Sequence, residues 1–208
     1  MTTTHLRLLL PIALGLALAN CGGTLLAHSD YERLPHDARQ EIFDSENDLI
    51  IARNREDGAS DKKRDMSKRL NDLDLRWVRT SQRLTAAGQA ARVPQARKVR
   101  DAQAAYLDAE IDVAKAEIQT TGLETALSRA RLALVRQRQL ARIGRVTGAS
   151  LKPLETAVTA LEAKVKAAAT AATAVRTKAE NGLEGWKAAE DEYARASGGD
   201  YDTVVWGD

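Results

Sequence analysis

The chain has 208 residues, of which 44% are hydrophobic, 29% are charged and only 4% are aromatic. This balance, with abundant Ala, Arg, Glu, Lys and Leu, is typical of long packed helices and argues against a deep compact core. The formal net charge of +2 gives no global field that would attract nucleic acid or an anionic membrane. Composition therefore favours an all-α protein and disfavours a nucleic-acid partner.

The first twenty residues have the pattern of a secretion signal. His5 and Arg7 form a short basic-leaning region, and Leu8 to Ala19 is an apolar stretch too short to span a bilayer comfortably. It ends in Leu18-Ala19-Asn20-Cys21. These residues resemble the lipobox of bacterial lipoprotein precursors, in which a leucine stands three residues before an invariant cysteine. Asn20 stands where glycine, alanine or serine is commoner.

The lipoprotein resemblance implies a diacylglyceryl thioether on Cys21, and several acyl chains anchor a protein stably. Gly22 follows the cysteine instead of an aspartate, which implies the periplasmic side of the outer membrane. Cys21 is the chain's only cysteine, so an internal disulfide is excluded. The alternative is an ordinary signal peptide, in which Cys21 is discarded or left as a stray thiol.

Residues 21–35 contain glycines, a Ser-Asp pair and no apolar period, which predicts a flexible lipidated tether. Pro35 fits the first turn of a helix, and the acidic residues Asp37 and Glu41 favour its positive N-terminus. The last residues, 197–208, follow a Ser-Gly-Gly break and predict a short tail outside the helices.

Between these ends, apolar residues recur at alternating spacings of three and four, which predicts three long helices at about 36–91, 95–143 and 151–196. The seam of the middle helix comprises Val99, Ala102, Tyr106, Ala109, Val113, Ala116, Thr120, Leu123, Leu127, Ala130 and Leu134. Residues 56–61 look like a loop, but the register continues across them, and we favour a continuous helix. Pro94 is expected to end the first helix.

Gly144 and Gly148 are expected to bracket the second turn, with Thr147 or Ser150 as a cap and Pro153 in the next first turn. Similar helices joined by tight turns run up, down and up. The predicted fold is an extended antiparallel three-helix coiled coil, with the helix of residues 95–143 as its middle strut.

Two blocks of the sequence are purely basic, from Arg76 to Arg100 and from Arg129 to Lys152. In the antiparallel rod, the first block would face the acidic end of the last helix, and the second would face the acidic start of the first helix. We therefore interpret them as internally paired faces. The alternative is an anion-binding end at one or both turns, formed by Arg92, Arg97, Lys98 and Arg100 or by Arg142 and Arg145.

No motif predicts catalysis, a cofactor or a metal site, because phosphate loops, Cys/His clusters and nucleophile settings are missing from the sequence. Trp77 and Trp186 lie on seams and are interpreted as core. The tail contains the β-prone, aromatic residues Tyr201, Val204, Val205 and Trp206, which could dock on a partner. A frayed terminus, or a strip folded back on the rod, is the alternative.

The resulting hypothesis is a non-enzymatic, lipid-anchored periplasmic rod that acts as a spacer or interaction subunit of an envelope assembly. Its expected partners are the membrane, through Cys21, and an unidentified protein; self-association is compatible with the fold but not required. The alternatives are a periplasmic holdase chaperone and a helical component of a trans-envelope transport machine.

Overall fold

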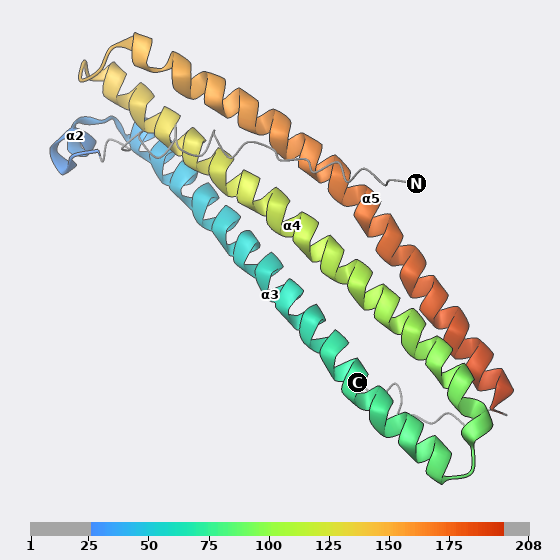
Figure 1. Ribbon diagram of the computed structural model, residues 1–208. Coiled ribbons are helices and arrows are strands. Elements are labelled where there is room, and N and C mark those ends of the chain that lie inside the picture. Colours follow the sequence, from blue (N-terminus) through green and yellow to red (C-terminus); the bar gives the residue numbers. More distant parts are fainter. Residues whose placement is uncertain (1–25, 198–208) are drawn as a thin grey trace, which may run out of the picture.

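The computed structural model describes residues 26–197, and within them the chain is helical between short turns. Three long helices, α3 (His36–Ala86), α4 (Val93–Arg142) and α5 (Lys152–Ala196), lie side by side and alternate in direction (Figure 1). A short helix, α2 (His28–Arg33), precedes them. The predicted all-α, antiparallel three-helix bundle is confirmed.

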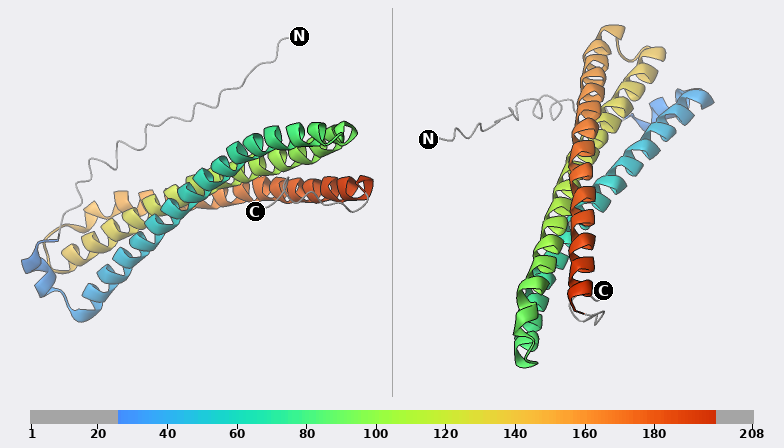
Figure 2. Two further views of the ribbon diagram at one scale, coloured as in Figure 1. Left: turned by 90° about the horizontal axis from the view of Figure 1, so that it is seen from below. Right: turned by 90° about the vertical axis from the view of Figure 1, so that its right-hand side faces the viewer.

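Helix α4 is the middle of the bundle. It packs along its length against α3 on one side and α5 on the other, whereas the backbones of α3 and α5 scarcely approach each other. The three helices therefore form an open, twisted layer instead of a closed bundle (Figure 2). Such a layer leaves the outer face of each flanking helix free of any other described helix.

The middle position of α4 requires two buried stripes, whereas the spacing of apolar residues predicted one. Its predicted seam packs on α5, where Ala109 and Val113 meet Ala179. A second stripe faces α3, where Leu132 packs against Ile42. Gln139, which bonds to Glu41, belongs to it too. The buried residues of α4 that lie outside the predicted seam include Leu107, Ala114, Thr125, Leu132 and Gln139.

The first helix is continuous, but it ends earlier than predicted. Residues 56–61 lie within α3, as we favoured. The stop is Gly88, not Pro94: Gly88 has a φ of 72°, and the Gln89 N–H donates to the carbonyl of Leu84 at 2.8 Å. This is a Schellman ending, in which glycine adopts the left-handed conformation at no steric cost.

Short 3₁₀ turns complete the two connections between the long helices. Ala90–Arg92 forms the first, and Pro94 then lies in the first turn of α4. Gly144, with a φ of 73°, ends α4 as expected. Gly148–Ser150 forms the second 3₁₀ turn, and no side chain caps α5, so the expected cap by Thr147 or Ser150 is wrong. Ser150 instead accepts a hydrogen bond from Gln137 at 2.9 Å.

The prediction of a flexible tether over residues 21–35 is wrong for residues 26–35. Residues from 26 onward pack on the bundle, because Leu34 is 2% exposed and lies with Ala38 and Ile42 against Leu132. The Asp30 carboxylate also accepts from Arg145 at 2.8 Å. The apolar residues that lacked a helical period in the sequence thus cover the end of the α3–α4 seam.

Charge pairs join the helices where the seams turn polar. Near the middle, Lys62 of α3 lies 3.4 Å from Glu110 and 3.5 Å from Glu117 of α4. Glu117 also accepts from Arg176 of α5 at 3.0 Å, so one carboxylate links all three helices. Half-exposed pairs of this kind add little stability each, which makes the middle of α3 the least apolar part of the contact.

Gly58, in this part of α3, offers a simple gain in stability. A Cβ placed on Gly58 would meet nothing within 4 Å. Replacing Gly58 with alanine is expected to raise the free energy of unfolding by about 0.5–1 kcal/mol, because alanine loses less backbone entropy in a helix. Urea unfolding followed by circular dichroism would measure the gain, and a loss would show that this stretch is not helical in solution.

Candidate functional site

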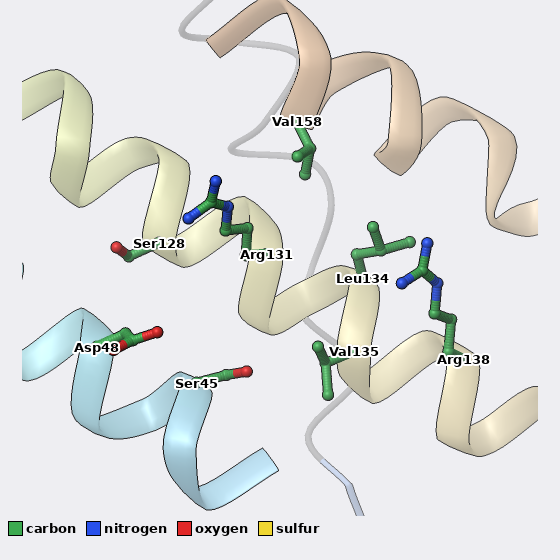
Figure 3. A pocket seen from close by; sticks show the side chains of 8 residues that line it. All are labelled: Ser45, Asp48, Ser128, Arg131, Leu134, Val135, Arg138 and Val158. Carbon is green, nitrogen blue, oxygen red and sulfur yellow. The ribbon is translucent and has the colours of Figure 1, made fainter. Parts of the chain in front are cut away.

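Near the Gly148 turn, the three helices enclose an open groove of about 330 Å³. Its floor is apolar, made by Leu134 and Val135 of α4 with Val158 of α5 facing them (Figure 3). Two arginines and a serine of α4 lie beside this floor, and a serine and an aspartate of α3 line the opposite side. The polar lining residues are Ser45, Asp48, Ser128, Arg131 and Arg138.

The arginines of this groove already have anionic partners. Arg131 donates to Glu162 at 2.8 Å, and Arg138 donates to Glu155 at 3.1 Å. Both glutamates belong to α5, so the groove is part of the α4–α5 contact. An anionic ligand would have to displace these carboxylates, and no nucleophile paired with a base lines the groove. Its chemistry is that of a packed helix junction.

The second basic block meets the acidic start of α3, as the charge pattern predicted. Arg136 lies 2.6 Å from Glu46, and Arg142 lies 3.5 Å from Asp37. Buried Gln139 adds a hydrogen bond to Glu41 at 2.6 Å. At the other end, the expected pairing with α5 is represented by Lys98 and Glu192, 3.2 Å apart.

Of the six cations predicted as anion-binding ends, five engage groups of the chain itself. Besides Lys98, Arg142 and Arg145, described above, Arg92 donates to the Ser197 carbonyl at 3.4 Å. Arg100 pairs with Asp74 of α3 and with its neighbour Asp101, and these contacts raise its pKa. Arg97 is exposed. Anion binding at these ends stays a prediction, but an incoming anion would compete with existing partners at most of these cations.

The aromatic residues at the Pro94 end are packed between the helices. Leu84, Ala96, Val99 and Tyr193 form a buried cluster that brings all three long helices together, with Trp77 and Trp186 at its margin. The rings of Tyr106 and Trp186 stack with centroids 5.6 Å apart, and burial raises the pKa of Tyr106. These positions support the interpretation of both tryptophans as core.

Glu190 lies beside this aromatic cluster, and its burial raises its pKa above the ordinary 4.5, while the neighbouring Trp186 indole lowers it. A raised carboxyl pKa means that the folded state binds the proton more tightly. The stability that this proton provides is complete below the unfolded pKa and is lost as pH rises through the folded value.

At pH 7, Glu190→Gln is therefore expected to be slightly more stable than wild type. Urea unfolding at pH 7 and near pH 4 checks this, since the difference should shrink at the lower pH; an advantage that grew on acidification would contradict it.

The outer face of α3 carries the feature that the sequence analysis missed. Every large apolar side chain that is exposed in residues 26–197 belongs to this helix, and none points toward α4. They are Phe43, Ile50, Ile51, Leu75 and Val78. These residues lie outside the predicted seam and were therefore not interpreted. The spacing of four of them, Phe43, Ile50, Leu75 and Val78, could have revealed a second apolar stripe on the helix.

Residues 26–197 hold no group of three or more His, Cys, Asp or Glu side chains arranged for a metal ion. Among the described helices, none has an apolar run of the length that a bilayer span requires. Cys21 and the tail residues lie outside the described residues; the latter are Tyr201, Val204, Val205 and Trp206.

Comparison with known proteins gave no relative: no family model, no curated protein and no solved structure matches the chain.

Proposed function

We propose that the protein is a non-catalytic, lipid-anchored rod of the bacterial cell envelope, where it serves as a spacer or interaction subunit. The observation that carries this proposal is the shape: helices of 51, 50 and 45 residues lie side by side along one axis. At about 1.5 Å per residue, the longest is roughly 75 Å long. Such a body sets a distance and offers long faces, whereas enzymes and small-molecule binders need an enclosing pocket.

The position of α2 supports an anchor at one end of the rod. α2 lies beside the Gly148 turn (Figure 1), and Asp30 pairs with Arg145 there. Residues 21–25 span no more than about 18 Å even when fully extended. A lipid on Cys21 would therefore hold the Gly148 end near the membrane, and the Pro94 end would project away from it.

The packing of residues 26–35 bears on how a spacer would work. A long flexible tether would let the rod tumble, but Leu34 is buried against α3 and α4. Because the last residues before α3 are fixed to the bundle, motion of the anchor point would be transmitted to the rod. This junction favours a spacer with a restricted orientation over a freely swinging binding module.

The anchor is tested by replacing Cys21 with alanine. Wild-type protein in growing cells is expected to incorporate labelled palmitate and to partition with outer membranes, and globomycin should cause the uncleaved precursor to accumulate. The Cys21→Ala variant should lose the label. Persistent labelling of the variant, or no label on the wild type, would contradict lipidation at this residue.

A protein partner is proposed at the far end of the rod, where α5 ends at Ala196 and the residues carrying Trp206 follow. The test compares crosslinked partners of the full chain with those of a chain truncated after Gly199. Loss of a specific protein from the truncated sample is expected. An unchanged set of partners would dismiss the tail as a docking peptide and leave the anchor proposal intact.

A holdase chaperone is the second candidate, favoured by the exposed apolar side chains of α3. A chaperone of this kind would suppress aggregation of an unfolded outer-membrane protein in a light-scattering assay. Replacing Ile51 with aspartate should weaken that suppression if α3 holds the client. No suppression by the wild-type chain would remove this candidate.

A further inference from the structure

The outer face of α3 carries two apolar ends separated by a charged middle. Phe43, Ile50, Leu75 and Val78 lie on one stripe, opposite the side that packs on α4, at alternating spacings of four and three. Read in order, the stripe is Phe43, Asn47, Ile50, Asn54, Asp57, Asp61, Arg64, Lys68, Asn71, Leu75, Val78 and Gln82. All of these residues except half-buried Asn47 are exposed. Exposed apolar groups gathered in this way mark an interaction face.

The charges along the stripe are ordered by sign. Two acidic residues, Asp57 and Asp61, precede two basic residues, Arg64 and Lys68. Within one chain, Arg64 donates to Asp61 at 2.9 Å, and both side chains are largely exposed. A stripe whose first half is apolar then acidic, and whose second half is basic then apolar, is complementary to itself when reversed.

We propose that the outer face of α3 binds a second copy of this chain, antiparallel and related by a two-fold axis between residues 62 and 63. In that arrangement Asp61 faces the partner subunit's Arg64, and Asp57 faces the partner subunit's Lys68. Ile50 packs on the partner subunit's Leu75. The stripe alternates between two heptad positions, and in this arrangement a residue at one position always faces a residue at the other position of the partner subunit. This is the geometry of an antiparallel coiled coil.

Because the two copies run antiparallel, their Gly148 ends lie at opposite ends of the dimer. Both lipid anchors could enter one membrane only if the rods lay along its surface, so this dimer and a rod that projects from the membrane are exclusive arrangements, and the test of the dimer is separate from the test of the anchor.

The charges select this register over its neighbours. Sliding one helix by a heptad in one direction would place Asp57 against the partner's Asp61. Sliding it in the other direction would place Arg64 against the partner's Lys68. Like charges that face each other disfavour both alternatives. The register that pairs opposite charges also brings Ile50 and Leu75 together, whereas Phe43 and Val78 face the partner subunit's Gln82 and the partner subunit's Asn47. The charges, and not the apolar residues, therefore select the register.

The size of the face suits a dimer of moderate affinity. From Phe43 to Gln82 the stripe is about 60 Å long, and a helix face about 10 Å wide would bury about 1,200 Å² over both copies. This is the lower end of the range for stable protein interfaces. No described helix obstructs the approach, because α5 lies on the far side of α4 (Figure 1).

The test measures self-association of the full chain in detergent by sedimentation velocity between about 1 and 100 µM. Wild type is expected to form dimers. Asp61→Arg alone and Arg64→Asp alone place like charges in the two central layers, and each should weaken dimerisation by about tenfold. The double variant, Asp61→Arg with Arg64→Asp, restores opposite charges and should dimerise like wild type. Ile50→Asn should weaken dimerisation without altering the register.

The matched control is Asp112→Arg on α4, which disrupts an Asp–Lys pair of the same spacing, 2.9 Å long in the structure, away from the stripe. It should leave dimerisation unchanged. A wild-type chain that stays monomeric over the whole concentration range would overturn the proposal. Binding of the stripe to lipid vesicles or to a different protein would not rescue it, because the proposed occupant is a second copy of this chain. A double variant as monomeric as the single ones would overturn it as well.

Discussion

Replacement of Ile42 with alanine is expected to lower the free energy of unfolding by about 2–4 kcal/mol. Ile42 is 3% exposed and lies in the cluster that joins Leu34, α3 and α4 at the Gly148 end. Its removal leaves a cavity between elements that cannot close it without moving α2. Urea unfolding followed at 222 nm, at one fixed protein concentration, measures the change.

The matched control is the same substitution at Ile51, on the same helix but 48% exposed. Ile51→Ala should change the free energy of unfolding by less than about 0.5 kcal/mol. Equal losses at Ile42 and Ile51 would show that the outer face of α3 is buried in solution. Fixed concentration matters because self-association through that face would itself add apparent stability.

Replacement of Gly182 with leucine is expected to destabilise the fold by about 1–3 kcal/mol, because an added side chain overpacks the α4–α5 contact. A Cβ on Gly182 would already lie 3.4 Å from the Tyr106 Cα and 3.8 Å from its Cβ. The further carbons of leucine have no room there without separating α5 from α4 and disturbing the stack of Tyr106 on Trp186.

Gly185→Leu is the control for this change, because a Cβ at Gly185 meets nothing within 4 Å. The same substitution there should raise the free energy of unfolding by about 0.5–1 kcal/mol, since leucine is the better helix former. Thermal unfolding of both variants tests the pair. A Gly182→Leu variant as stable as Gly185→Leu would mean that α5 does not approach α4 closely at this point.

The alternation of three and four in the apolar residues predicts three long helices, and the charge blocks predict their antiparallel order. Both predictions are confirmed, because a heptad seam must face a partner along its whole length and opposite charges must meet. The pairs of Arg136 with Glu46 and of Lys98 with Glu192 are examples. The register also predicted that α3 would continue through residues 56–61.

The end of α3 and the packing of residues 26–35 depend on backbone conformation and on long-range contacts, which the local sequence pattern does not encode. α3 ends at Gly88 and not at Pro94, because the turn requires a positive φ, which glycine adopts without steric cost. Residues 26–35 lack a helical period, yet they fold onto the bundle because Leu34 can cover an open seam. Local pattern cannot find such a contact, since it joins residues about a hundred positions apart.

Periodicity and charge along the chain are enough to predict the helices, their directions and the middle place of α4. The separation of the α3 and α5 backbones, in contrast, is visible only in the packed fold. One seam on each flanking helix is satisfied by α4 alone, so no buried area is left to draw the two together.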